Sequence, residues 1–154
     1  MDQLAQSRSL HAHVLRRQRS ARHELLLCDS DFRLAAQCER MRVDRNGSVV
    51  SLLLIRLPET ADDRPGLAFL VKLLEARLRM TDTPGLLADG RVGILLPDTP
   101  AEGAWKVAED ISECFPPGPT RPECDVRLYP PKGRSDGFDK LAESPGEEQT
   151  DRRQ

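Results

Sequence analysis

The sequence has no long apolar segment and no clear excess of charge of either sign. None of its apolar runs approaches the roughly 18 residues that cross a bilayer as a helix, so we expect no transmembrane segment. No apolar stretch follows the basic residues near the start of the chain, as it would in a secretory signal. The formal net charge is -2, whereas dedicated nucleic-acid binders usually carry a basic excess. We therefore expect a cytoplasmic protein with no nucleic-acid partner.

The cysteines also lack a metal-binding arrangement. The chain has 4 of them and no C-x-x-C pair: Cys28, Cys38, Cys114 and Cys124. Their spacing relative to the three histidines fits no established zinc pattern, and zinc ligation with His11, His13 or His23 is kept only as the alternative. Free thiols in a reducing compartment are the expectation, and we expect no cofactor.

The 154 residues are enough for one domain with a packed core and flanking segments. Residues 1–29 are predicted to form a polar arm rich in arginine, either solvated or in contact with an acidic partner or an anionic lipid surface. Residues 30–131 carry the patterns of regular secondary structure. Residues 132–154 are charged and poor in apolar residues, which predicts a disordered tail.

The domain begins with a predicted helix and a buried strand. Ser30 is a suitable N-cap for the helix, and Asn46-Gly47 ends it. The expected inner face of this helix carries Phe32, Ala35, Ala36 and Met41. The run SVVSLLLIRLP at 48–58 is almost continuously apolar and stops at a proline. This pattern predicts a central strand covered on both faces.

A second helix and a hairpin follow. Pro65, preceded by acidic residues, marks the helix start. An apolar stripe with helical spacing extends the helix over 66–80. A short strand at 85–87 and a returning strand at 91–96 then flank Ala88-Asp89-Gly90. Asp-Gly between two such segments predicts a β-hairpin.

The last predicted elements are another helix and another strand. Thr99 and Glu102 are spaced as a capping box, in which the threonine hydroxyl accepts from the first turn and the carboxylate reaches back. Trp105 borders the expected inner face, which carries Ala104, Val107, Ala108, Ile111 and Phe115. Apolar and polar residues alternate at 124–129, which predicts a half-buried strand.

Together these elements predict an α+β domain. The order strand–helix–strand–strand–helix–strand is that of a ferredoxin-like βαββαβ core, an antiparallel sheet with two helices on one face. A helix precedes this core, and flexible tails flank it. The arrangement alone implies no activity.

The same elements resemble a GGDEF domain, the nucleotidyl-cyclase fold of bacterial diguanylate cyclases, over residues 31–115 and more loosely to 130. The strand SLLLIRLP is similar to the family's LLLIDID strand. The leading helix carries a similar F…E…R…R pattern, at Phe32, Glu39, Arg42 and Arg45. The family's R-x-x-D, five residues and GG[DE]EF correspond to Arg79-Met80-Thr81-Asp82, five residues and Ala88-Asp89-Gly90-Arg91-Val92.

The resemblance stops at the residues that perform the chemistry. In the family, carboxylates on the first strand and in the hairpin hold the magnesium that neutralises a triphosphate. The corresponding first-strand positions are Arg56 and Pro58, and Arg91 replaces the hairpin glutamate. The family's Asn-Asp pair falls at Arg64-Pro65. The resemblance therefore implies a degenerate domain that is not an enzyme. Asp89 is expected to be a turn residue that tolerates positive φ, with a shifted metal ligand as the alternative.

One functional pair of the family is retained. Arg79 and Asp82 match the R-x-x-D of the inhibitory site for cyclic di-GMP, where a guanidinium binds guanine or phosphate and a carboxylate accepts from the guanine edge. The alternative is structural, with the arginine complementing a helix dipole and the aspartate beginning a loop. The family usually adds a second arginine, for which Arg77 is the candidate.

The resemblance leaves three functions open. The first is a catalytically inactive GGDEF-like signalling or regulatory domain, an interaction or sensory module with a protein partner. The second is a cyclic di-GMP receptor that binds through Arg79 and Asp82. The third is an active nucleotidyl cyclase with altered metal ligation, which would turn over GTP or ATP with magnesium.

Overall fold

The computed structural model describes residues 25–59 and 64–131. Most of the predicted arginine-rich arm, at 1–24, and the predicted tail at 132–154 lie outside the described residues, as do residues 60–63. The statements below concern the described part of the chain.

The elements follow the predicted order, and their bounds are α2 (Asp29–Asn46), β1 (Val50–Arg56), α3 (Arg64–Arg77), β2 (Thr83–Leu86), β3 (Val92–Pro97), α4 (Ala101–Glu113) and β4 (Glu123–Tyr129). The strands form a four-stranded sheet in the order β2-β3-β1-β4. Every pair of neighbouring strands is antiparallel. This is the predicted ferredoxin-like βαββαβ core with a helix before it.

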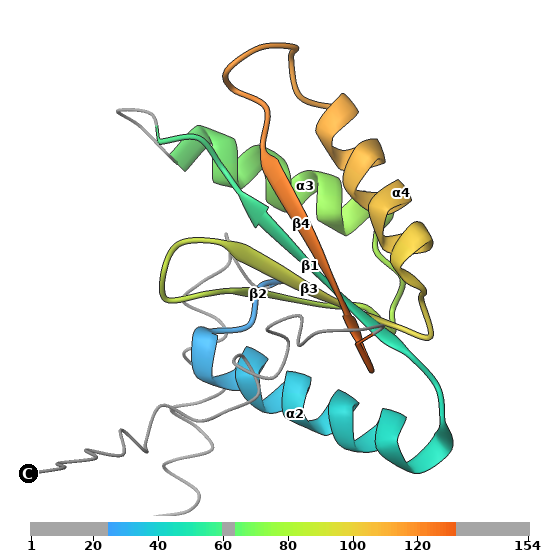
Figure 1. Ribbon diagram of the computed structural model, residues 1–154. Helices are drawn as coiled ribbons and strands as arrows, with labels where there is room; N and C mark the ends of the chain where they lie inside the picture. The colour runs from blue at the N-terminus through green and yellow to red at the C-terminus, as the bar shows by residue number, and fades with distance from the viewer. Residues whose placement is uncertain (1–24, 60–63, 132–154) are drawn as a thin grey trace, which may run out of the picture.

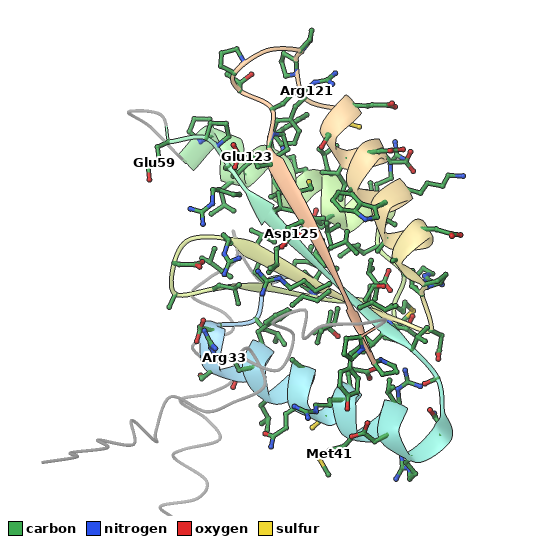
Figure 2. All side chains as sticks on the ribbon, in the orientation of Figure 1. Arg33, Met41, Glu59, Arg121, Glu123 and Asp125 are labelled. Atoms are coloured by element: carbon green, nitrogen blue, oxygen red, sulfur yellow. The ribbon has the colours of Figure 1, made fainter. Side chains whose placement is uncertain are left out.

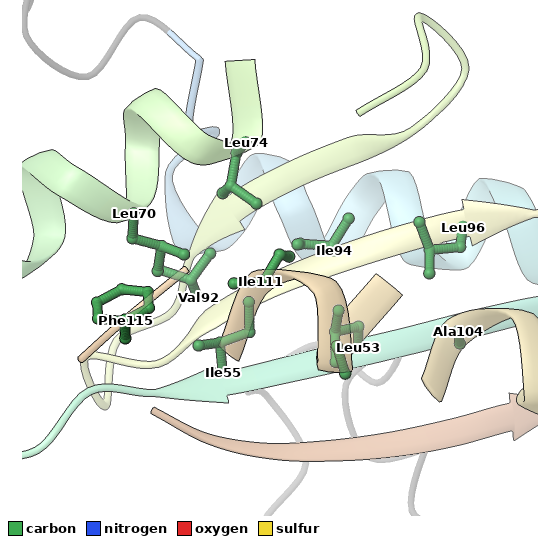
Figure 3. Close-up of a cluster of buried hydrophobic side chains, with 11 residues drawn as sticks. Leu53, Ile55, Leu70, Leu74, Val92, Ile94, Leu96, Ala104, Ile111 and Phe115 are labelled. Atoms are coloured by element: carbon green, nitrogen blue, oxygen red, sulfur yellow. The ribbon is translucent and has the colours of Figure 1, made fainter. Parts of the chain in front are cut away.

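The helices cover both faces of the sheet (Figure 1). On one face, α3 and α4 enclose a core of eleven buried residues, which Figure 3 shows: Leu53, Ile55, Leu70, Leu74, Val92, Ile94, Leu96, Ala104, Ala108, Ile111 and Phe115. On the other face, α2 packs on a second core that consists of Phe32, Ala36, Val43, Val50, Leu52, Leu54, Leu87, Leu95 and Tyr129. Side chains of β1 alternate between the two cores, because neighbouring residues of a strand point to opposite faces. The prediction of a central strand covered on both faces is confirmed.

Phe32 fixes α2 on the sheet by packing against glycine. Gly85 and Gly93 are paired directly across β2 and β3. A Cβ atom at Gly85 would lie 2.5 Å from Phe32 Cδ2, and one at Gly93 would lie 2.8 Å from Phe32 Cε1. The fully buried ring therefore occupies the space that side chains at these two positions would need.

The residues just before α2 extend the sheet beyond β2. Leu27 forms a parallel bridge with Gly85. The Leu27 amide donates to the Pro84 carbonyl at 3.0 Å, and the Leu86 amide donates to the Leu27 carbonyl at 2.8 Å. Leu25 and Leu26 pack against the core under α3 and α4.

Two predicted features of α2 are wrong. The helix begins at Asp29 with Cys28 in the N-cap position, so Ser30 lies inside the first turn. Met41 is 64% exposed. Val43 is buried in its place, because the side of α2 that faces the sheet is set by Phe32 and Ala36.

The predicted capping box of α4 is also wrong. The N-cap position is held by Pro100, and no side chain caps the helix there. The Thr99 hydroxyl instead donates to the Pro97 carbonyl at 3.0 Å. The predicted inner face of α4 is nevertheless confirmed, since Ala104, Ala108, Ile111 and Phe115 are all buried.

Candidate functional site

The first candidate site is the turn between β2 and β3, together with the end of β1. The Leu87 amide donates to the Arg91 carbonyl at 2.8 Å, and the Gly90 amide donates to the Leu87 carbonyl at 3.0 Å. Gly90 has φ 86°, the conformation for which glycine is suited. β1 runs antiparallel to β3 with Ile55 opposite Val92, so Arg56 ends beside this turn.

Arginine surrounds the one carboxylate of the turn. Arg91 Nε donates to Asp89 Oδ2 at 2.7 Å, and the Arg91 amide donates to Asp89 Oδ1 at 3.0 Å. Partial burial raises the pKa of Asp89. The hydrogen bonds and charge of Arg91, with the charge of Arg56, outweigh burial and hold that pKa below its ordinary value. Both oxygens of Asp89 are therefore already bonded to Arg91.

Asp89 is a turn residue for a different reason from the one expected. The positive φ falls on Gly90, whereas Asp98 is the only described non-glycine residue with positive φ. Asp89 contributes by accepting the amide of the residue two positions later, as short polar side chains do in turns.

A second carboxylate, from α2, holds the turn in place. The Ala88 amide donates to Asp29 Oδ1 at 2.8 Å, and Arg33 Nε donates to Asp29 Oδ2 at 2.7 Å. These two hydrogen bonds, with that from Arg33 the larger effect, lower the pKa of Asp29. No local pattern indicates this contact, because the two partners are 59 positions apart in the chain. Within residues 25–59 and 64–131, no three His, Cys, Asp or Glu side chains are grouped so as to hold a metal ion.

The end of β1 also borders a hollow of mixed charge. Arg56 and Pro58 line a cavity of about 240 Å³ together with Leu57, Glu59, Pro119, Arg121 and Glu123. Figure 2 labels Glu59, Arg121 and Glu123 around the end of β1 and the loop before β4.

The second candidate site is a hollow of about 380 Å³ between the end of α3 and the start of α4. Its lining consists of Arg77, Leu78, Arg79, Asp82, Asp98, Thr99, Pro100, Gly103 and Val107. The structure therefore brings Arg79, Asp82 and Arg77 to one cavity. Sequence reasoning missed Asp98 and Thr99, which are distant from this pair in the chain but adjacent to it in the fold.

Arg79 and Asp82 contact each other in a tight turn. The Arg79 amide donates to Asp82 Oδ2 at 2.8 Å, and Arg79 Nε lies 3.6 Å from the same oxygen. Arg79 Nη2 donates to Thr99 Oγ1 at 2.8 Å. The Arg79 side chain is 62% exposed and the Asp82 side chain 4%. The arginine thus lies at the mouth of the hollow and the carboxylate at its wall.

The lining of this hollow contains one polar atom that the described residues leave unsatisfied, because Asp82 Oδ1 is buried and receives no hydrogen bond from them. Arg42, which does not line the hollow, has a similarly unsatisfied atom, Nη2. Arg42 Nη1 lies 3.4 Å from Asp98 Oδ1. Asp98 itself has φ 52°, a conformation that costs a non-glycine residue free energy. Buried acceptors without donors are rare in folded proteins, so Asp82 Oδ1 marks a position where a ligand or solvent hydrogen bond would be favourable.

Arg77 lines the same hollow but is directed elsewhere. Its Nη1 lies 3.7 Å from Asp110 Oδ2 on α4, and its Nη2 lies 3.9 Å from Cys114 Sγ. A role as the second arginine would require its side chain to leave Asp110.

Comparison with known proteins gives matches by structure and none by sequence. No protein-family model matches the chain, and no curated protein sequence matches it. Solved structures that match include a sensory box/GGDEF family protein from Caulobacter crescentus CB15, with a TM-score of 0.57 and 16% identity over 76% of this chain and 88% of that one. Another is the diguanylate cyclase SiaD from Pseudomonas aeruginosa in complex with its activator SiaC, with a TM-score of 0.54 and 16% identity over 82% of this chain and 58% of that one.

No helix in the described part of the chain is long and apolar enough to span a bilayer. At 16% identity the structural matches establish the fold and not the activity. The chain therefore has the fold of GGDEF domains.

Proposed function

We propose that this chain is a non-catalytic GGDEF-like domain that acts as a signalling or regulatory module and binds a protein partner. The observation that carries the proposal is the set of arginines at the turn. Asp89 is bonded to Arg91, and Arg56 adds a second positive charge beside it.

The electrostatics of this turn oppose magnesium binding. Magnesium requires oxygen ligands, usually one or two carboxylates together with substrate phosphates. A cation that approached Asp89 would have to displace the Arg91 guanidinium and would meet Arg56 at close range, where like charges repel. Replacement of Arg91 by glutamate would remove one cation and supply a carboxylate.

The structural comparison is the support for a protein partner. SiaD was solved in complex with an activator protein, so a protein that contains this fold can form such an assembly. A module that has lost its metal site still presents the surfaces of the fold to a partner.

The test is metal-dependent nucleotide turnover by the full chain. We expect no product from GTP or ATP with magnesium or manganese, and no metal-induced rise in melting temperature. The Arg91→Glu variant is the matched control for metal binding, and it should gain a metal-induced rise that the unmodified chain lacks. Magnesium-dependent product from the unmodified chain would overturn the proposal.

The second candidate function is a cyclic di-GMP receptor, and the observation that favours it is the unsatisfied Asp82 Oδ1 beside the hollow. A guanine N–H group that reached this oxygen would supply the missing donor. The exposed Arg79 guanidinium would meet a phosphate or guanine acceptor at the mouth of the hollow.

Calorimetric titration of cyclic di-GMP into the full chain distinguishes the two candidates. Receptor function predicts saturable heat that Arg79→Ala abolishes. Arg121→Ala is the matched control, because it removes an exposed arginine that lines the other hollow. Absence of heat from the unmodified chain, Arg79→Ala and Arg121→Ala would eliminate the receptor function. The protein-binding module would then be the remaining candidate.

A further inference from the structure

The face of α2 that points away from the sheet has the pattern of a helix–helix interface. It carries Asp31, Leu34, Cys38, Met41 and Arg45, all exposed. At 100° per residue these positions lie within an arc of about 80°. The arc is opposite the buried residues Phe32, Ala36 and Val43. Figure 2 shows Met41 directed away from the sheet.

The spacing on this face is that of a coiled-coil seam. Successive members are separated by three, four, three and four residues, the repeat of the a and d positions of a heptad. Leu34 is 59% exposed and Met41 64%. Isolated exposed apolar side chains are ordinary. Two of them aligned with Cys38 on one seam form an apolar strip across the middle of the helix.

The charges at the ends of the strip determine what can cover it. Asp31 and Arg45 are each seven residues from Cys38, on opposite sides. Neither forms an ion pair with any residue in the described ranges, 25–59 and 64–131. A parallel copy of α2 would place Asp31 against Asp31 and Arg45 against Arg45. An antiparallel copy would place each aspartate against an arginine.

We propose that this face binds a second copy of the chain, with the two α2 helices antiparallel about a two-fold axis at Cys38. In this arrangement Asp31 faces Arg45 of the second copy, Leu34 faces Met41, and Cys38 faces Cys38. The same patch serves both subunits, as a two-fold interface requires. The seam is short, since 18 residues of helix span about 27 Å. It is therefore smaller than a standard interface, and a weak, concentration-dependent dimer is expected.

Charge reversal tests this arrangement directly. Sedimentation of the full chain should show a monomer–dimer equilibrium. Asp31→Arg alone and Arg45→Asp alone should each weaken dimerisation, because each places like charges together. The double variant Asp31→Arg/Arg45→Asp should restore it. Both positions are exposed, but Asp31 lies in the first turn of α2 and Arg45 in the last, so each reversal opposes the helix dipole and should lower the melting temperature slightly. A cooperative unfolding transition well above the assay temperature, measured at low concentration, would show that the fold is intact.

Cross-linking at Cys38 gives an independent measurement. A variant that retains only Cys38 should form a covalent dimer with a short bis-maleimide, and addition of Leu34→Glu should prevent it. A variant that retains only Cys28, which is also exposed, is the matched control and should not cross-link.

Each other outcome overturns the proposal. A chain that remains monomeric at high concentration has no such interface. Dimerisation unaffected by the single charge reversals would place the contact elsewhere. A chain that dimerises only after removal of residues 1–24 or 132–154 would show that the intact chain covers this face with its own segment.

Discussion

The packing of Phe32 on the glycine pair yields a prediction that separates two positions by the atoms they meet. A Cβ at Gly93 would lie 2.8 Å from Cε1 and Cζ of Phe32, whereas a Cβ at Gly85 would meet its Cβ, Cγ and Cδ2 at 2.5–2.7 Å. Side chains do not tolerate such distances, so each Gly→Ala substitution must displace the ring. Such overpacking costs about 1–3 kcal/mol.

Leucine at position 32 lacks the outer ring atoms but retains Cβ, Cγ and Cδ. Phe32→Leu by itself leaves a partly filled space and should cost about 1–2 kcal/mol. It should relieve Gly93→Ala, because the atoms that meet the new methyl group are absent. The double variant Phe32→Leu/Gly93→Ala should therefore be more stable, by about 1–2 kcal/mol, than the sum of the two single-variant effects predicts. Gly85→Ala should not be relieved.

Urea unfolding, monitored by circular dichroism, measures the stability of the unmodified chain, of each single variant and of each double variant. Gly66→Ala is the control for the substitution itself, because the nearest atom to a Cβ there is Leu57 Cδ1 at 3.9 Å. It should leave stability unchanged or raise it slightly. Additive effects at Gly93, or equal relief at both glycines, would refute the packing argument.

Three further predictions concern polar groups. Tyr129 is the only tyrosine in the chain, and its hydroxyl donates to Asp44 at 2.6 Å. That bond, and then burial, raise its pKa above the ordinary 10.0, so ultraviolet titration of the phenol should give a higher value than in denaturant, and Asp44→Asn should reduce the difference. The pKa of Asp29 is lower in the folded chain than its ordinary 3.8, so the carboxylate stabilises the fold above pH 3.8, and this stabilisation is lost as the pH falls through the lower native pKa. The difference in unfolding free energy between the unmodified chain and Asp29→Asn should therefore disappear on acidification below about pH 4. Ser51 is fully buried and donates to the Thr99 carbonyl at 2.7 Å, so Ser51→Ala should cost about 1 kcal/mol of unfolding free energy in the same urea assay.

The fold could be predicted because its signals are local. The run at 48–58, the Asp-Gly turn and the alternation at 124–129 each specify an element from adjacent residues. The order of the elements then permits few arrangements of the sheet. The inner face of α4 was also predicted correctly, since its apolar residues recur with helical spacing.

The errors occurred where a distant residue competes with a local pattern. Thr99 has the spacing of a cap, but Arg79, twenty residues earlier, donates to its hydroxyl, which itself bonds to Pro97. Ser30 is a good N-cap in isolation, but the N-cap lies two residues earlier, at Cys28, and the first helical residue, Asp29, accepts a hydrogen bond from the Ala88 amide.

The candidate site was predicted only in part. The pairing of Arg79 with Asp82 follows from their separation of three residues. The contribution of Asp98 and Thr99 to the same hollow depends on the fold of the hairpin, which a linear pattern does not contain. The arginines at positions 56 and 91 were visible in the sequence, whereas the hydrogen bond from Arg91 to Asp89 was not.

The bridge between Leu27 and Gly85 bears on how the chain avoids aggregation. An uncovered edge strand offers unpaired backbone groups to other chains. At the β2 edge, Leu27 occupies those groups, whereas the opposite edge, β4, carries charged residues such as Glu123 and Asp125 that disfavour pairing. A fragment that starts at residue 30 would retain every named helix and strand almost intact, yet it would leave the backbone groups of the β2 edge that Leu27 covers unpaired. Its shortcoming would be poor solubility more than poor folding.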